Sequence, residues 1–199
     1  MPSEPPAATP AVTEAVPAAA SRTTYKIVPG ESSVTYEVGE TFFNQNNRFN
    51  LAVGVTQQVS GEIQLDPAVP SSAEIGEIQV DISQFQSDSG RRDNAIQGRW
   101  LESATYPLAV FKPTSLEGLP ETYTEGEQIS FKVTGDLTVK QMTQPAAFQV
   151  TASLSNGTLS GSATTTILLS QFGVGPIMIA GMLGTEDEAK LTLQFVART

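Results

Sequence analysis

The chain has 199 residues, of which 39% are hydrophobic and 16% are charged, so it is long enough for one β-domain of ordinary size. Acidic residues outnumber basic residues by 21 to 11, and the formal charge of −10 argues against a nucleic-acid partner and against adsorption to an anionic membrane surface. The absence of cysteine and histidine excludes disulfides, thiolate nucleophiles, imidazole bases and the usual zinc or copper ligands.

Residues 1–24 contain five prolines and seven alanines without a periodic pattern of large apolar residues, which predicts a disordered linker before a folded domain at 25–199. The segment lacks the basic start and continuous apolar stretch of a signal peptide. We expect an export signal, with or without a lipid-anchored cysteine, to precede Met1. The protein would then be extracytoplasmic, whether periplasmic, secreted or tethered to a membrane through the linker. The alternative is a cytoplasmic protein with a flexible tail.

From Tyr25 onward, apolar and polar residues alternate with period two in short segments separated by turn residues, which predicts a half-buried antiparallel β-sheet. About eight strands can be counted. The apolar series that carry this prediction are Val34, Tyr36 and Val38; Ile78, Val80 and Ile82; Ile129, Phe131, Val133, Leu137 and Val139; and Leu191, Leu193 and Phe195.

Asn156-Gly157 is the preferred pair for a two-residue type I′ hairpin turn and fixes the register of the strands on either side. The inward face of this hairpin is small, which leaves interior space for a ligand or else permits a bend or close packing. The expected pairs are Ser155 with Thr158, Leu154 with Leu159, Ala152 with Gly161, Val150 with Ala163, and Phe148 with Thr165.

One helix is predicted over residues 88–103, with Asp88 or Ser89 as its N-cap. Ile96 and Trp100 share one face of it. Because Gly98 weakens an isolated helix by about 1 kcal/mol, the helix must pack against the sheet, closing one end or side of it.

Arg91, Arg92 and Arg99 lie within nine positions of an acidic protein. Such a cluster could hold a phosphate head group. The alternative is that these side chains pair with nearby carboxylates such as Asp93 and Glu102.

Six segments follow one another along the chain: YKIVPGESSVTYEV, RRDNAI, YPLAVFKPTSL, VTGDLTVKQMTQPAAFQV, SQFGVGP and LGTEDEAKLTLQFVA. In their order and spacing, from Tyr25 to Val196, they resemble the YceI-like family of polyisoprenoid- or lipid-binding proteins. The resemblance implies an extended, eight-stranded, lipocalin-like barrel with an isoprenoid or fatty-acid-derived amphiphile threaded through its interior. It implies carriage or storage of that lipid without catalysis or a cofactor.

This sequence also departs from the family pattern. A longer loop is expected where an early strand often carries a histidine, Gln141 stands where glycine is common, and Leu169 and Gln171 stand where arginine and aspartate are common. Polar ligand contacts therefore transfer poorly, and only the apolar contacts carry over.

Burial of an alkyl or prenyl chain yields about 0.8 kcal/mol per methylene, so apolar lining residues are enough to bind such a ligand. Some of the candidates are expected to be ordinary core. The candidate ligand-binding residues are Phe42, Phe43 and Phe49 on the early loop, Ile96 and Trp100 on the helix, Phe111, Phe131 and Phe148 on strands, and Phe172, Ile177, Met178 and Met182 near the end.

The segment 174–183 is too short to span a bilayer and is expected to be an irregular strand or a lid. The acids at 186–188 are expected to keep a turn solvated, and no specific metal is predicted. Exposed strand edges would permit a homodimer.

Two other functions stay open: an enzyme with paired carboxylates, and a scaffold or adhesion module with a filled core. The interior distinguishes them. A continuous apolar tunnel favours lipid carriage, a solid core favours a scaffold, and a polar cleft with two carboxylates favours an enzyme.

Overall fold

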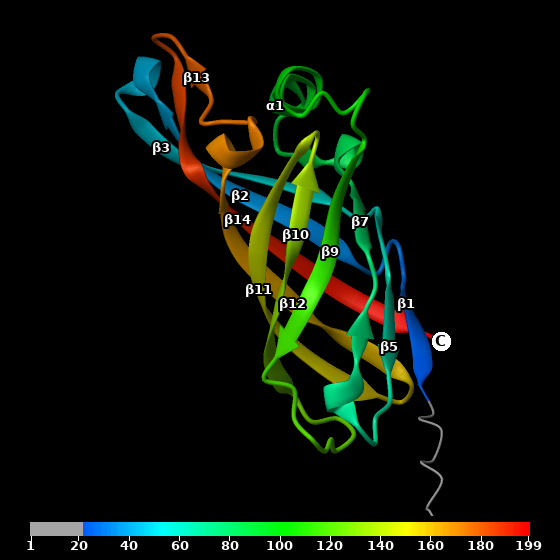
Figure 1. Ribbon diagram of the computed structural model, residues 1–199. Helices are drawn as coiled ribbons and strands as arrows, with labels where there is room; N and C mark the ends of the chain where they lie inside the picture. Colours follow the sequence, from blue (N-terminus) through cyan, green and yellow to red (C-terminus); the bar gives the residue numbers. More distant parts are fainter. Residues whose placement is uncertain (1–21) are drawn as a thin grey trace, which may run out of the picture.

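The computed structural model describes residues 22–199, so residues 1–21 of the predicted linker lie outside the described part of the chain. The described chain is an all-β domain with one short α-helix (Figure 1). The strands are β1 (Thr23–Ile27), β2 (Ser33–Phe42), β3 (Arg48–Thr56), β4 (Val59–Ser60), β5 (Glu62–Leu65), β6 (Glu74–Ile75), β7 (Ile78–Asp81), β8 (Gln86–Ser87), β9 (Leu108–Glu117), β10 (Ile129–Val139), β11 (Met142–Ser155), β12 (Thr158–Leu168), β13 (Met178–Ile179) and β14 (Leu183–Arg198). The helical elements are α1 (Gly90–Ala95), a π-helical turn (Ile96–Trp100) and 3₁₀ turns at Phe43–Gln45, Pro70–Ser72, Ile82–Gln84 and Leu169–Phe172.

The first strand begins inside the segment that we predicted as linker. Thr23 and Thr24 pair with Leu65 and Gln64 of β5, so their backbone groups belong to the sheet. The first described strand therefore includes Thr23 and Thr24, two residues of the predicted linker.

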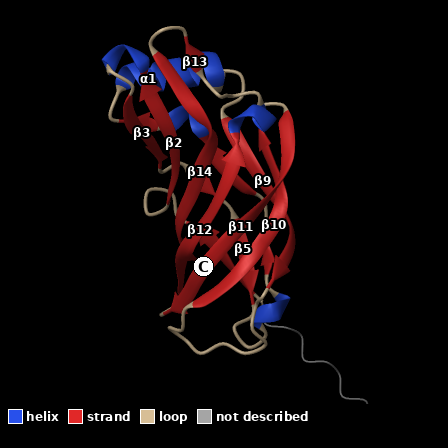
Figure 2. Ribbon diagram, turned by 90° about the vertical axis from the view of Figure 1, so that its left-hand side faces the viewer, coloured by secondary structure: helices blue, strands red, loops and turns tan. Residues whose placement is uncertain are grey.

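Ten strands follow one hydrogen-bonded path in the order β4-β7-β9-β10-β11-β12-β14-β1-β5-β6, and neighbouring strands are antiparallel. β2 and β13 pair with β14, β3 pairs with β2, and β8 pairs with β3. The path curls into a half-barrel around an interior (Figures 1 and 2). It has more and shorter strands than the predicted eight, because short breaks such as Gly61 divide longer extended segments.

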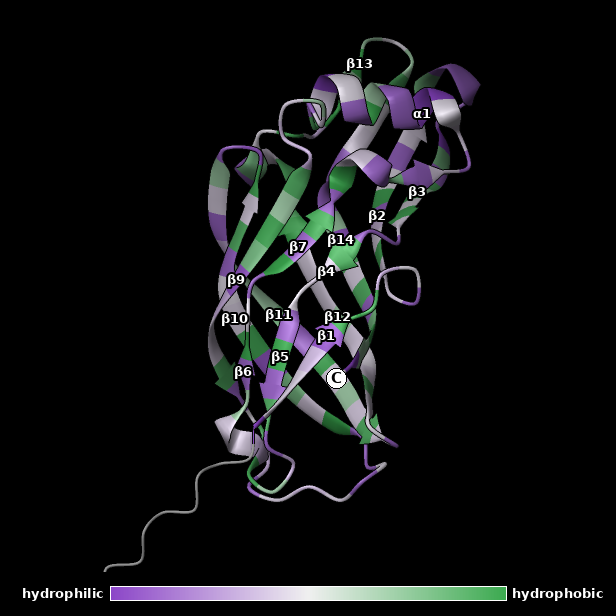
Figure 3. Cartoon of the chain, turned by 90° about the vertical axis from the view of Figure 1, so that its right-hand side faces the viewer, coloured by the Kyte–Doolittle hydropathy of each residue, from purple (hydrophilic) through white to green (hydrophobic). Residues whose placement is uncertain are grey.

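Period-two alternation places apolar side chains inside the curled sheet, as the sequence predicts. Along β10, Val133, Leu137 and Val139 are buried, whereas Asp136 is exposed. Hydrophobic and hydrophilic positions alternate along the strands in Figure 3. The core is therefore the inner face of the sheet.

The predicted hairpin at Asn156-Gly157 is confirmed. Both residues have positive φ, 49° and 71°, as a type I′ turn requires, and the strands pair as expected from Ser155 with Thr158 through Val150 with Ala163. The strand pairing ends at Gln149 with Thr164, so the expected next pair, Phe148 with Thr165, does not form.

The early loop that we predicted around Phe42, Phe43 and Phe49 is instead a hairpin between β2 and β3. Thr41 pairs with Phe49 and Phe42 pairs with Arg48, and a 3₁₀ turn joins the two strands. Asn46 and Asn47 both have a φ of 56° and reverse the chain, since asparagine tolerates the left-handed region.

Residues 39–51 of this hairpin and residues 177–185 extend together beyond the rest of the sheet, at the upper left of Figure 1. We call these two segments the projection. The short β13 and the turn before β14 take the place of the irregular strand or lid predicted at 174–183.

The helix is shorter than the predicted range 88–103. α1 ends after six residues, and in the π-helical turn that follows, Leu101 N–H donates to the Ile96 carbonyl at 2.8 Å. Ser89 is the N-cap, and its Oγ accepts a hydrogen bond from the N–H three residues on at 3.4 Å. Gly98 lies in the wider turn, where its low helix propensity disfavours a regular continuation.

We predicted a solvated turn at the acidic residues 186–188. They lie instead within β14. The register between β14 and β2 shifts between Thr185 and Ala189, so the three acids form a bulge opposite β2. Asp187 accepts hydrogen bonds from Ser170 N–H at 2.7 Å and from Ser170 Oγ at 2.6 Å.

Candidate ligand-binding cavity

The curled sheet encloses a cavity of about 650 Å³. Its walls come from all the long strands and are almost entirely apolar. Apart from Tyr36, the polar side chains in the lining are Glu40, Asn44, Gln45, Ser89, Arg91, Arg92 and Thr185. These residues belong to the projection and to the helix region, so the polar groups of the lining gather at one end of the cavity.

The cavity opens at this same end. The lining residues that are exposed to solvent are Asn44, Gln45, Arg91, Ala95, Ile179 and Met182. They come from the 3₁₀ turn after β2, from α1 and from the β13–β14 turn, which lie together at the top of Figure 2. We call this opening the mouth.

Nine of the twelve predicted ligand-binding residues lie in the cavity wall. They are Phe42, Ile96, Trp100, Phe111, Phe131, Phe148, Phe172, Ile177 and Met182. The structure thus brings together residues from β2, the helix region, the central strands and the C-terminal segment. Their contact with a ligand stays a prediction.

Phe43, Phe49 and Met178 do not line the cavity. Phe49 is 60% exposed and Met178 is 63% exposed. They lie on the outer face of the projection, where Gly39 and Gly184 leave room for them: a Cβ at Gly39 would stand 3.0 Å from Phe49 Cε2, and one at Gly184 would stand 2.9 Å from Phe43 Cζ.

Ile96 and Trp100 both reach the cavity from the π-helical turn, as their predicted common face requires. Trp100 is half-buried, and the Arg99 guanidinium lies over its ring, 4.8 Å from the centroid. Lys140 Nζ donates to the Trp100 carbonyl at 3.2 Å and also pairs with Glu102. The turn is therefore held to the end of β10 beside the mouth.

The small residues of the Asn156-Gly157 hairpin have two different roles. Ala152 and Ala163 line the cavity. At Gly161, in contrast, a Cβ would stand 2.9 Å from Phe195 Cζ, so that glycine permits close packing. The sequence left two explanations open for these small residues. Interior space for a ligand applies at Ala152 and Ala163, and close packing applies at Gly161.

A buried ion pair stands at the mouth. Arg92 Nε donates to Glu40 Oε1 at 3.0 Å and Arg92 Nη2 donates to Glu40 Oε2 at 2.8 Å, while the two side chains are 13% and 5% exposed. Arg92 Nη1 donates to Ser87 Oγ at 3.2 Å and to the Asp88 carboxylate, and Asn50 Nδ2 donates to Glu40 Oε2 at 3.1 Å. The hydrogen bond to Glu40 raises the pKa of Arg92, which stays charged.

Glu40 is the charged residue of the cavity wall that sequence reasoning missed. It stands 52 positions before Arg92, so no local spacing links the two. One signal was present: Glu40 continues the inward series of Val34, Tyr36 and Val38 along β2, and a carboxylate at an inward position needs a partner.

The three arginines of the predicted head-group cluster have separate surroundings. Arg92 is neutralised by Glu40 and Asp88, Arg99 stacks on Trp100 outside the lining, and Arg91 is exposed and lines the mouth. Arg92 thus pairs with carboxylates, as the alternative explanation predicts, but its partners are Glu40 and Asp88 and not Asp93 or Glu102.

Those two carboxylates have other partners. Asp93 accepts hydrogen bonds from Ser87 N–H at 3.0 Å and from Ser87 Oγ at 2.6 Å, and Glu102 pairs with Lys140. Both therefore help to hold the segments around the mouth in place.

Tyr36 lies in the cavity wall, and its ring meets Phe85 edge to face with centroids 5.1 Å apart. Burial raises the pKa of Tyr36 to about 12. The phenol therefore stays neutral at physiological pH.

Within residues 22–199, Glu40 is the one carboxylate in the cavity wall, so the cavity does not offer the carboxylate pair of a glycosidase. In the same part of the chain, no group of three or more acidic side chains is placed to hold a metal ion. None of the described helices has the length and apolar character needed to cross a membrane.

Solved structures that share this fold include the following three. BcnA from Burkholderia cenocepacia has a TM-score of 0.64 and 20% identity, over 85% of this chain and 98% of that chain. A polyisoprenoid binding domain from Saccharophagus degradans, implicated in plant cell wall breakdown, has a TM-score of 0.63 and 11% identity, over 88% of this chain and 98% of that chain. A YCEI protein from Campylobacter jejuni has a TM-score of 0.56 and 18% identity, over 71% of this chain and 81% of that chain.

No curated protein matches the sequence. The family model of the YceI-like domain matches residues 25–197. This match includes nearly all of the curled sheet, the helix and every residue of the cavity wall. The chain belongs to the YceI-like domain family.

Proposed function

We propose that the protein binds a long apolar amphiphile, of polyisoprenoid or fatty-acid type, and carries or stores it without catalysis. The observation that carries this proposal is the cavity of about 650 Å³, which has an apolar wall and a polar mouth. This volume lies within the usual range for small-molecule sites, about 300–1,000 Å³. The polyisoprenoid-binding description of the Saccharophagus degradans neighbour agrees with the proposal.

The binding form is an eight-stranded barrel. Each of the segments β1–β2, β3–β5 and β6–β8 acts as one long, interrupted strand beside β9, β10, β11, β12 and β14. β4 and β5, near opposite ends of the hydrogen-bonded path, are separated in the chain only by Gly61. Ile27 N–H donates to the Gly61 carbonyl at 3.0 Å, which links β1 to this junction. Such closure would remove the edges of the sheet and surround an elongated ligand.

The ligand's tail occupies the apolar interior and its polar end stays at the mouth. Ten buried carbons would yield about 8 kcal/mol before ordering costs, so the tail supplies most of the affinity. Arg91 is the arginine of the predicted cluster that remains available to a head group, since it lines the mouth and has no ion pair within residues 22–199. Arg92 shapes the mouth through Glu40.

We place this activity outside the cytoplasm, where the predicted N-terminal linker would connect the domain to an export signal or a membrane anchor. Fractionation of the native cells tests this placement. Recovery of the protein with cytoplasmic markers would contradict it.

Native mass spectrometry of the purified protein tests the binding function. We expect a mass in excess of the chain that is released by organic solvent and identified as a prenyl or acyl lipid. A protein that is empty, and that also fails to take up farnesol or palmitamide, would refute the proposal in favour of a scaffold.

A further inference from the structure

Exposed apolar side chains gather beside the mouth. Residues 22–199 contain eleven exposed large hydrophobic residues, and six of them lie on the projection: Phe43, Phe49, Leu51, Met178, Ile179 and Met182. A soluble surface rarely exposes a contiguous apolar patch of this kind unless it contacts a partner or a membrane. At the opposite end of the sheet, near the 3₁₀ turn that follows β5, the exposed large hydrophobic residue is Val69.

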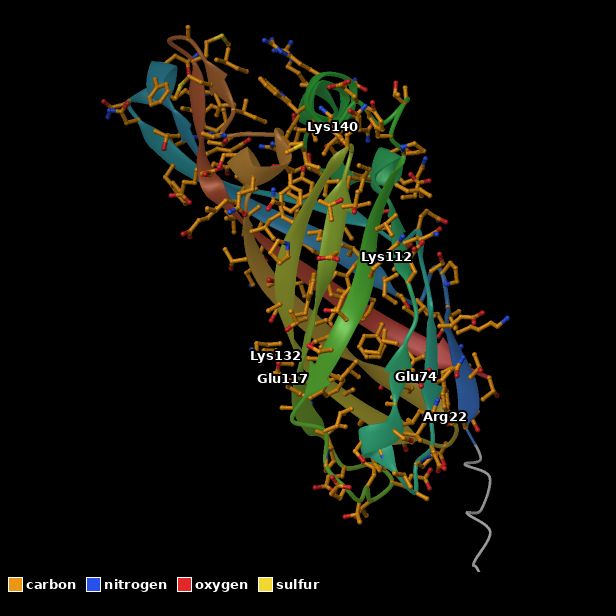
Figure 4. The ribbon with its side chains drawn as sticks, in the orientation of Figure 1. Arg22, Glu74, Lys112, Glu117, Lys132 and Lys140 are labelled. Carbon is orange, nitrogen blue, oxygen red and sulfur yellow. The ribbon has the colours of Figure 1, made fainter. Side chains whose placement is uncertain are left out.

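The arginines that form no ion pair with an acid of the described chain, residues 22–199, lie at the same end. Eight of the eleven basic residues form ion pairs with acids, as Arg22 does with Glu74 and Lys132 does with Glu117 (Figure 4). The three for which residues 22–199 offer no ion pair are Arg48, Arg91 and Arg99. Arg48 begins β3 on the projection, Arg91 is in α1, and Arg99 is in the π-helical turn.

We propose that the projection and the helix region form a docking surface for an anionic lipid bilayer. The apolar side chains of the projection enter the interfacial layer, and the three arginines meet anionic head groups. The mouth would then face the bilayer, so that an amphiphile moves between membrane and cavity without crossing water. This inference goes beyond the proposed binding function and can fail separately from it.

A bilayer fits this surface better than a second copy of the chain does. In a symmetric dimer the same patch meets itself, so Arg48 of each copy would face the like charges of the other. Glu186 stands beside Phe49 over Gly39, so charge alone does not carry the contact. Apolar insertion and arginine contacts therefore act together, although the whole chain has a charge of −10.

Vesicle co-sedimentation of the full chain tests the proposal. The vesicles are phosphatidylcholine alone, or an equal mixture with phosphatidylglycerol. We expect binding to the mixture only, weakened by salt because exposed charges are screened. Arg48→Gln/Arg99→Gln should weaken binding at least tenfold, since each basic residue near an anionic surface contributes a factor of about five. The matched control, Arg22→Gln/Lys132→Gln, removes two cations that have ion pairs and should bind as the wild type does.

A second pair of variants tests the apolar contact. Phe49→Ser should weaken vesicle binding about tenfold, whereas Val69→Ser, an exposed residue far from the mouth, should leave it unchanged. Circular dichroism and the thermal midpoint confirm that each variant folds.

Three results would overturn the docking surface: no wild-type binding to the mixed vesicles, equal losses in the control variants, or sedimentation of the free protein as a dimer that Phe49→Ser dissociates. Displacement of the fluorescent probe N-phenyl-1-naphthylamine by farnesol, measured on the same samples, reports ligand binding in the cavity. Displacement without vesicle binding refutes docking alone, and vesicle binding without displacement refutes the carrier function alone.

Discussion

The body of the sheet and the mouth of the cavity follow different rules. In the body, apolar side chains point inward, polar side chains point outward, and basic residues such as Lys112 and Lys132 pair with acids. At the mouth, the ion pair of Arg92 and Glu40 lies inside, while Phe49 and neighbouring apolar residues lie outside. The body has the side-chain pattern that folding requires, and the mouth departs from that pattern where we propose that a ligand enters.

β3 combines a buried inner face with an apolar outer face. Ala52, Gly54 and Thr56 point inward and are buried, whereas Leu51 and Val55 point outward and are exposed. On β10, the outward positions are polar instead. An apolar outer face is therefore a property of the region near the mouth and not of the sheet as a whole.

The largest expected effect concerns the ion pair at the mouth. Arg92→Met should lower the free energy of unfolding by about 3 kcal/mol, because it leaves the Glu40 carboxylate buried without its partner. Urea denaturation measures this loss. The double variant Arg92→Met/Glu40→Met should recover most of it, since no unpaired charge remains. A loss below about 1 kcal/mol in the single variant would mean that water already solvates the pair.

The second effect tests the open interior of the body. Ala163→Trp should weaken farnesol binding about 100-fold, because an indole at this position of the wall fills the space of the tail. Its thermal midpoint should change little, since a cavity accepts the added volume. Ser162→Trp, at the neighbouring position on the other face of β12, is the matched control and should bind normally. Strong destabilisation by Ala163→Trp would indicate a filled core, and therefore a scaffold.

The body could be predicted from the sequence because burial imposes a period of two, as along Val133, Leu137 and Val139, and because Asn156-Gly157 fixes one register. The mouth could be predicted only in part. Helical spacing predicts a common face for Ile96 and Trp100, and both line the cavity, whereas no spacing points to Glu40, because its partner is distant in sequence.

The differences at the mouth have physical causes. Phe43 and Phe49 are predicted as ligand contacts because they are assigned to a loop, but this segment forms a hairpin and both side chains face outward. Three consecutive acids at 186–188 are typical of a solvated turn, whereas a bulge within a strand, which they form here, has no distinct sequence pattern. Net charge gives no information on where charges lie, so it does not show that Arg48, Arg91 and Arg99, which form no ion pair within residues 22–199, lie at one end of the sheet.

The third effect lies at the boundary between the two regions. Trp100→Ala should weaken farnesol binding about tenfold, because the indole lines the cavity beside the mouth. Trp100 is the single tryptophan, so its fluorescence in the wild type should also change on titration with farnesol. Removal of a buried tryptophan can cost about 3–5 kcal/mol, so the thermal midpoint is measured beside the affinity. A variant that unfolds readily yet binds normally while folded would show that Trp100 is core.

The smallest effect is a loss of stability at alkaline pH that comes from Tyr36. Burial raises its pKa to about 12 in the folded protein, from 10.0 for the free side chain. The nearby Arg92 acts in the opposite direction, and Asp93, Glu40 and Asp88 add to the rise. Because the unfolded chain releases the phenolic proton first, this contribution to stability is complete below pH 10 and is lost as the pH rises through 12.

Tyr36→Phe removes the titrating group and keeps the ring against Phe85. Between pH 8 and pH 11 the wild type should therefore lose more stability than this variant, by up to about 1 kcal/mol after allowance for partial solvent access. Urea unfolding of both proteins at the two pH values gives the difference directly, because every other group is common to the two proteins and cancels. Equal losses would mean that water reaches the hydroxyl of Tyr36, and that the wall of the cavity is wet at this position as well as at the mouth.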